Sequence, residues 1–138
     1  MSRYLLDTSA LLTLHNDESG SQRVADLLQE AAEGRVEVFG CFMSLMEVLY
    51  RVWKSAGESA GRAAYAQCQA LPMTWVRESP PLLESAARLK ALHPMSLADA
   101  WIAAAALQCG ATLVHKAPEF EGVETLRQER LPYKAKGR

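Results

Sequence analysis

Residues 96–114, with the sequence SLADAWIAAAALQCGATLV, determine most of what can be inferred about the fold. Residues 97–107 are apolar or small nearly all the way round a helix, which is the pattern of a buried central helix. Gly110 is expected to end this helix. The continuous apolar run 111–114 follows at once and predicts a buried strand. A buried helix that leads directly into a buried strand indicates a sheet with helices packed against it.

The same alternation extends in both directions from this stretch. Short apolar runs predict strands at residues 4–6, 36–39 and 74–76, with a weaker one at 123–126. Helical spacing and end signals predict helices at residues 9–14, 18–33, 44–56, 59–70 and 80–92. Strands that alternate with helices predict an α/β protein, a three-layer α/β/α sandwich around a central, mostly parallel sheet.

Composition limits the kinds of partner that the protein can have. The 138 residues, of which 49% are hydrophobic and 22% charged, suit a single domain over residues 1–138. Fifteen basic residues against sixteen acidic ones give a net charge of -1, so any polyanion must be held by a local patch or a metal. A basic tail begins at about Arg127, and we expect it to be solvated and partly frayed.

The cysteines and the hydropathy pattern predict a cytoplasmic protein. Cys41, Cys68 and Cys109 are odd in number and widely spaced, as is typical of reduced thiols. Asp7 interrupts the first apolar run early, which argues against a signal peptide. No apolar stretch approaches the roughly 20 residues that a membrane span needs, so no membrane partner is expected.

Three acids occur at the starts of predicted helices, among residues expected in the core. Asp7 follows the first strand, and ligands of parallel sheets bind beyond such strand ends, although the helix cap is an alternative role. Glu47 and Asp99 each follow a serine by three residues, which is also the spacing of a capping box. Asp is less usual than Glu at that position of the box, so capping explains Asp99 less well than Glu47.

Considered together, the three acids favour a metal site. Buried carboxylates that converge repel one another and raise each other's pKa values, unless a divalent cation neutralises them. Oxygen ligands without a Cys/His set at metal-binding spacing favour Mg²⁺ or Mn²⁺ over zinc.

The segments around these acids resemble a known family, and the resemblance extends over nearly the whole chain. Residues 5–11 (LLDTSAL), 44–48 (SLMEV) and 96–106 (SLADAWIAAAA) are similar to PIN-domain ribonucleases, particularly the VapC toxins of bacterial toxin–antitoxin pairs. The resemblance implies a Mg²⁺-dependent endoribonuclease, with Mn²⁺ as a substitute, that leaves a 5′-phosphate and a 3′-hydroxyl. It also implies a homodimer, and silencing by a VapB-type antitoxin.

The resemblance assigns catalytic and metal-binding roles to Asp7, Glu47 and Asp99, and it matches Thr8 or Ser9 to the hydroxyl residues beside the first acid. The fourth acidic position does not match. Where the family continues after the last buried strand with a pattern such as His-Lys-Asp-Pro-Glu-Phe, this chain has Ala117, which cannot bind metal.

Three consequences of that change are open. Glu119 supplies the missing oxygen, water fills the position, or the domain is a catalytically inactive binding module for RNA or antitoxin. Mg²⁺ commonly retains several waters, so one lost ligand weakens a site more readily than it abolishes it. Glu119 equally fits an ordinary first-turn acid after Pro118.

Candidate contacts for RNA and protein partners are less specific. Arg51 and Lys54 could form a positive rim that binds RNA phosphates, or be solvated charges on a helix. His115 is a candidate phosphate contact, with a partly exposed structural residue as the alternative. The segment 43–70 could be a two-helix arm that holds a second subunit or an antitoxin helix, or it could pack in the core.

Overall fold

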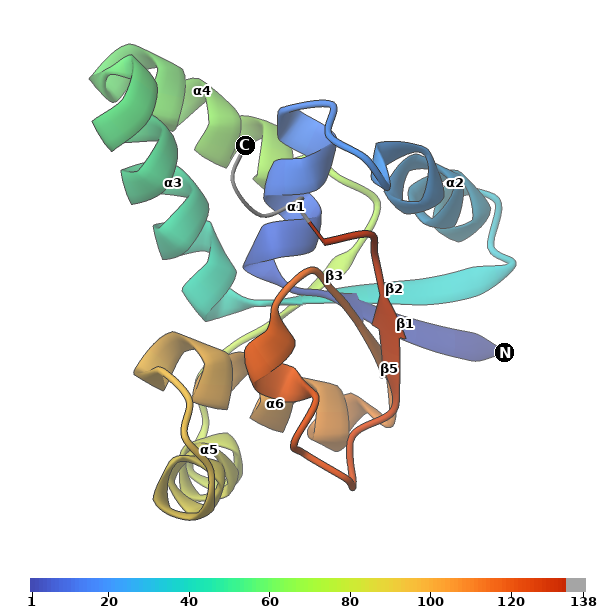
Figure 1. The fold of residues 1–138 in the computed structure, drawn as a ribbon. Coiled ribbons are helices and arrows are strands. Elements are labelled where there is room, and N and C mark those ends of the chain that lie inside the picture. Colours follow the sequence, from blue (N-terminus) through green and yellow to red (C-terminus); the bar gives the residue numbers. More distant parts are fainter. Residues whose placement is uncertain (134–138) are drawn as a thin grey trace.

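The computed structural model describes residues 1–133 as a sheet with helices on both faces (Figure 1). The strands are β1 (Ser2–Leu6), β2 (Val36–Cys41), β3 (Thr74–Val76), β4 (Thr112–His115) and β5 (Gln128–Arg130). The helices are α1 (Thr8–His15), α2 (Ser21–Ala32), α3 (Phe42–Ala56), α4 (Glu58–Gln69), α5 (Pro80–Leu92) and α6 (Leu97–Cys109), with a 3₁₀ turn, η1 (Pro118–Phe120).

The sheet is parallel throughout its five strands, in the order β3-β2-β1-β4-β5. From β1 the chain builds outward through β2 and β3, then returns to the other side of β1 for β4 and β5. The strand order therefore reverses between β1 and β4. In open parallel sheets, such a reversal leaves a crevice beyond the carboxyl ends of the two strands.

Adjacent side chains of the central strand reach the two cores. Leu5 and Leu6 are both fully buried, and they belong to different hydrophobic clusters because successive side chains of a strand point to opposite faces. Helices α5 and α6 cover the face of Leu5, and α1 to α4 cover the face of Leu6 (Figure 1). The predicted three-layer fold is confirmed, as is the buried helix α6.

Two predicted helix starts are wrong. Helix α2 begins at Ser21 rather than residue 18, after Gly20, whose φ of 101° is readily adopted by glycine. Helix α3 begins at Phe42, directly behind β2, so Ser44 lies inside the helix and is fully buried. Ser44 is therefore not the cap that its spacing from Glu47 suggests.

The last strand also differs from prediction. Val123 and Leu126 are buried but lie in turns, and β5 forms at Gln128–Arg130 instead. The backbone of this polar segment pairs with β4, with Leu113 opposite Gln128. Apolar side chains here anchor the turn, and ladder hydrogen bonds define the strand.

The start of the basic tail is ordered rather than frayed. Glu129 accepts two hydrogen bonds, of 2.7 and 2.9 Å, from the guanidinium of Arg23. Leu131 is 2% exposed. The remaining basic residues of the predicted tail, Lys134, Lys136 and Arg138, lie outside the described residues.

Within residues 1–133, no helix is both long enough and apolar enough to cross a membrane. All three cysteines are free thiols, two of them buried.

Candidate active site

A pocket of about 570 Å³ opens beyond the carboxyl ends of β1 and β4. Its lining brings together four carboxylates that the sequence separates by up to 112 positions: Asp7, Glu47, Asp99 and Glu119. They come from the end of β1, the second turn of α3, the first turn of α6 and η1. The pocket therefore lies at the reversal of strand order, where the topology predicts a ligand crevice.

Asp7 is both a helix cap and a wall of this pocket. Its side chain is 2% exposed, and its Oδ1 accepts a hydrogen bond of 2.8 Å from the backbone N–H of Ala10, which caps α1. Burial raises the pKa of Asp7 to about 7, against the opposing hydrogen bonds from Ser9 and Ala10, and the charges of Asp99 and Glu47 raise it further. The capping bond thus orients the Asp7 carboxyl, but it does not offset the effect of burial on the pKa.

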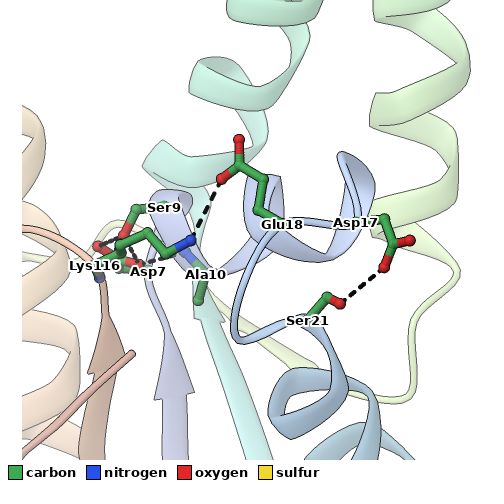
Figure 2. A network of polar contacts seen from close by, with 7 residues as sticks. All are labelled: Asp7, Ser9, Ala10, Asp17, Glu18, Ser21 and Lys116. Atoms are coloured by element: carbon green, nitrogen blue, oxygen red, sulfur yellow. Dashed lines mark hydrogen bonds and ion pairs between the residues drawn. The ribbon is translucent and has the colours of Figure 1, made fainter. Parts of the chain in front are cut away.

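Ser9 joins the two loops that frame the crevice. Its Oγ lies 2.7 and 2.8 Å from the two carboxyl oxygens of Asp7 and accepts a 2.8 Å hydrogen bond from the backbone N–H of Lys116 (Figure 2). The Lys116 ammonium extends to Glu18, 3.5 Å away, and its side chain is 6% exposed. Figure 2 shows the side chain of Lys116 paired with Glu18, so the charge of Lys116 is directed to that carboxylate.

Glu47 is held by the first residue of α1. Its Oε1 accepts a 2.6 Å hydrogen bond from Thr8 Oγ1, which also lies 2.9 Å from Ser44 Oγ. Thr8 and Ser44 are buried, whereas Glu47 is partly exposed. Two buried hydroxyls therefore position the carboxylate of Glu47 beside the loop that carries Asp7.

Asp99 lies in the first turn of α6, where the Oγ of Ser96 accepts a 3.1 Å hydrogen bond from its backbone N–H. Burial, followed by the charges of Glu119 and Glu47, raises the pKa of Asp99 to about 6. A hydrogen bond with Ser96 and the charge of Arg51 act in the opposite direction. Glu119 itself is exposed, at the rim of the pocket.

The donor set fits a hard divalent cation. Carboxylates and hydroxyls line the pocket, and its lining contains no cysteine or histidine. Burial, and then the neighbouring negative charges, raise the pKa values of two of the carboxylates, and a bound cation would oppose these shifts. Among residues 1–133, no three acids, cysteines or histidines are close enough to form a ready-made ligand set, so the pocket offers the donors without a preformed cage.

The other candidate residues divide into two groups. Thr8, Ser9 and Arg51 line the pocket, as does Lys116. Lys54 is exposed near the end of α3, outside the lining. His115 is fully buried, and both of its ring nitrogens bond within the protein, so the predicted phosphate contact is wrong for this residue.

Two residues beside the pocket were missed by sequence reasoning. Ser44 was interpreted as a cap, and Gln128 lay in the segment expected to fray, although its side chain bonds to His115. Ser44 is a polar residue between two apolar ones, whereas Gln128 lies between two charged residues, Arg127 and Glu129. Sequence alone carries no sign of their partners, which lie 36 and 13 positions away.

Comparisons with known proteins agree with this fold. The family model of the PIN domain matches residues 4–125. No curated protein matches the chain in sequence. Among solved structures, the chain is similar to VapBC2 from Rickettsia felis bound to a DNA fragment from its promoter (TM-score 0.76, 18% identity, covering 94% of this chain and 99% of that one).

Two further structures show the same likeness. DNA-bound VapBC from Salmonella typhimurium has a TM-score of 0.75 and 20% identity, covering 94% of this chain and 98% of that one. VapC20 of Mycobacterium tuberculosis, a toxin that cleaves the sarcin-ricin loop, has a TM-score of 0.66 and 18% identity, covering 85% and 92%.

Proposed function

This chain belongs to the PIN domain family, and from that premise we propose that it is a VapC-like toxin, a Mg²⁺-dependent endoribonuclease neutralised by a cognate antitoxin. One observation carries the proposal: four carboxylates from four separate segments line a single pocket at the strand-order reversal. The raised pKa values of the buried Asp7 and the half-buried Asp99 support a role for a cation there, because stability alone does not favour carboxylates withdrawn from water beside one another.

Asp7, Glu47 and Asp99 would hold the Mg²⁺, or Mn²⁺ in its place, and act as the catalytic acids. Glu119 would provide the fourth carboxylate that Ala117 does not. When bound, the cation would acidify a water and stabilise negative charge on the phosphoryl group.

The chain's own residues orient these acids. The Ala10 N–H and the Ser9 hydroxyl fix the plane of the Asp7 carboxyl, and Thr8 fixes Glu47. Arg51, which lines the same pocket, would bind an RNA phosphate beside them, and Lys54 would extend that contact along α3. Because the net charge is -1, substrate attraction would depend on such local contacts.

Incubation of purified protein with RNA in Mn²⁺ or Mg²⁺ tests this function. We expect cleavage that EDTA abolishes and that Asp7→Asn and Asp99→Asn each remove. The products should carry a 5′-phosphate and a 3′-hydroxyl, with the 2′-hydroxyl taking no part as nucleophile. A 2′,3′-cyclic phosphate end, or cleavage that persists in EDTA, would contradict the proposal.

A second function is favoured by Ala117 and by the lack of a preformed ligand set among residues 1–133. In this alternative the chain is a catalytically inactive module that binds RNA or antitoxin through the same fold. It predicts RNA binding without cleavage at any Mn²⁺ concentration. It also predicts that Ala117→Asp, which restores the family's acid, confers cleavage on an otherwise inactive protein.

Exposed apolar side chains on α3 support a protein partner. Met46, Tyr50 and Trp53 follow one another at helical spacing and are 61%, 39% and 39% exposed, so ordinary core packing does not account for them. We propose a homodimer and a VapB-type antitoxin as the partners, acting in the cytoplasm. Sedimentation of the chain alone separates the two: a dimer that Trp53→Glu dissociates assigns the stripe to the second subunit, and a dimer that persists in Trp53→Glu leaves the stripe for the antitoxin. A monomeric original protein would contradict the proposed homodimer.

A further inference from the structure

We infer that His115, buried behind the pocket, is a positioning residue that fixes the segment 117–119 and thereby directs Glu119 toward Asp99. The inference rests on the proposed function, because it takes the Glu119 carboxylate to be one of the metal ligands. It assigns roles to His115 and Gln128 that neither the family pattern of acids nor the lining of the pocket indicates.

The imidazole of His115 connects three elements at the end of β4. Its Nδ1 accepts a 3.1 Å hydrogen bond from the backbone N–H of Ala117, and its Nε2 lies 2.9 Å from Oε1 of Gln128 on β5. Gln128 Nε2 in turn donates 2.8 Å to the carbonyl of Phe120. These hydrogen bonds attach the backbone at Ala117 and at Phe120, on either side of Pro118 and Glu119, to one network of side chains.

These bonds define one protonation state. The Ala117 N–H can only donate, so Nδ1 must be the unprotonated acceptor. Nε2 then carries the hydrogen and donates to Gln128 Oε1, which leaves the Gln128 amide nitrogen to donate to Phe120, as observed. The neutral tautomer with hydrogen on Nε2 therefore satisfies every polar atom of the network.

Within the turn, the backbone N–H groups of Phe120 and Glu121 donate to the carbonyls of Ala117 and Pro118, which shapes the turn but does not fix where it is attached to the sheet. Pro118 and Glu119 are exposed, so the packing of their own side chains does not determine where the Glu119 carboxylate lies. The fully buried ring of Phe120 anchors one end, with its centroid 5.2 Å from that of His115. The other end depends on the Ala117 N–H and on the Lys116 N–H, which donates to Ser9.

Ala117 explains why Glu119 would need such a positioning network. A carboxylate at position 117 would lie only two residues after the end of β4, nearer to the sheet than Glu119. Glu119 lies two residues further along, in a turn of three residues, and has a longer side chain to orient. The loss of the acid at 117 therefore transfers the positioning of a carboxylate from the sheet to the His115–Gln128 network.

Paired substitutions separate the two bonds of the imidazole. His115→Asn keeps an acceptor near the place of Nδ1, and so keeps the bond from Ala117. His115→Gln keeps a donor near the place of Nε2, and so keeps the bond to Gln128 while losing that from Ala117. We expect His115→Gln to weaken Mn²⁺ binding about 10- to 100-fold, as loss of an orienting contact does. His115→Asn should stay within about threefold of the original protein because it retains the Ala117 bond.

A double-mutant cycle with Glu119→Gln tests whether His115 acts through Glu119. The dissociation constant of Mn²⁺ is measured by calorimetry for each single variant and for the pair. Once Glu119→Gln has removed the carboxylate, His115→Gln should change the constant by no more than about twofold, because coupled residues are not additive. In the metal-free protein, hydrogen exchange of the Ala117 amide should accelerate in His115→Gln and stay protected in His115→Asn.

Either of two outcomes would overturn the inference. His115→Gln could leave Mn²⁺ affinity unchanged, or it could reduce affinity equally with and without Glu119, as a general loss of structure would. If His115→Gln does not fold, Gln128→Met removes the bond to the Phe120 carbonyl, which His115→Asn retains, and so frees the other end of the segment. Its loss of Mn²⁺ affinity should likewise disappear once Glu119→Gln has removed the carboxylate. An original protein that binds no Mn²⁺, or an Asp7→Asn variant that binds it equally well, would instead refute the proposed metal site itself.

Discussion

The segments Ser44–Glu47 and Ser96–Asp99 have the same pattern, a serine followed three residues later by an acid, and the structure uses them differently. Ser96 is the N-cap of α6, where its hydroxyl accepts a hydrogen bond from the backbone of Asp99. Ser44 lies in the first turn of α3, fully buried, with its hydroxyl 2.9 Å from that of Thr8. Both acids nevertheless line the same pocket.

The difference arises from what precedes each helix. A turn after α5 separates that helix from α6, which leaves Ser96 free to adopt the extended backbone of a cap. Strand β2 continues into α3 without a loop, so the cap position falls on Cys41, whose side chain makes no capping bond. The spacing of serine and acid therefore predicts where the acid lies, and the connection before the helix decides what the serine does.

The largest expected effect is a difference in RNA cleavage between variants of Asp99 and of Glu47. Asp99→Asn should reduce RNA cleavage by about 10²- to 10⁴-fold, as removal of a group that acts at the reacting centre does. Glu47→Gln should cost about 10- to 100-fold, because its amide retains the Thr8 contact and water can replace the lost charge. Cleavage rates are measured at saturating Mn²⁺.

Asp26→Asn is the matched control for these two variants. Asp26 is an exposed acid of α2 outside the pocket, and its substitution should leave the rate unchanged. Equal losses for Asp99→Asn and Glu47→Gln would show that the two segments contribute equivalent acids and would remove the distinction.

The pH dependence of stability should be large in the metal-free protein. The pKa of Asp7 is about 7 in the folded protein, against 3.8 for the ordinary group, so folding favours its protonated form. This contribution to stability is complete below pH 3.8 and is lost as the pH rises to about 7. Each pKa unit corresponds to about 1.4 kcal/mol, so the loss amounts to several kcal/mol.

Urea unfolding in EDTA from pH 4 to 7.5 measures this loss. Asp7→Asn keeps the cap of α1, since Asn and Asp cap equally well. Its free energy of unfolding should therefore rise relative to that of the original protein as the pH increases. Asp99→Asn should lower the pKa of Asp7 more than Glu47→Gln does, because the charge of Asp99 contributes more to it. Parallel pH profiles for the original protein and Asp7→Asn would contradict the assigned shift.

A smaller effect tests the two serines directly. Glycine is nearly as good a cap as serine, so Ser96→Gly should reduce the free energy of unfolding by only a few tenths of a kcal/mol. Ser44→Gly places glycine inside a helix and removes a buried hydroxyl, so it should cost about 1 kcal/mol for the helix and about 1 kcal/mol more for the lost hydrogen bond. A larger loss for Ser96→Gly in urea unfolding would reverse the assignment of the cap.

The sequence was sufficient for those features that depend on neighbouring residues. The periodicity of residues 97–114 predicted α6 and β4, and the position of Asp7 after β1 predicted an acid at the crevice, because parallel strands end at one edge of the sheet. The convergence of Glu47 and Asp99 on that crevice could likewise be predicted from their places near helix starts.

The features that sequence did not predict depend on partners distant in the chain. Ser44 differs from Ser96 because Thr8 lies against it, and His115 is buried because Gln128 and Phe120 enclose it. Strand β5 has no apolar pattern of its own and exists because β4 offers an unpaired edge. Such contacts are fixed only after the sheet has assembled, and no local pattern encodes them.

The smallest predicted effect concerns a charge that the α3 segment has and the α6 segment lacks. Arg51 follows Glu47 by four residues and lines the pocket, whereas the corresponding residue of α6, Ala103, is fully buried. Arg51→Ala should weaken RNA binding several-fold and reduce the slope of log affinity against log salt by about 0.7, the value of one phosphate contact on a single strand.

Lys54→Ala, on the same helix but outside the pocket, is the matched control and should change the slope by less. Filter binding of RNA to the Asp7→Asn protein at several salt concentrations measures both slopes without cleavage. Equal slopes for the two variants would mean that α3 contributes only its acid to the pocket, as α6 does.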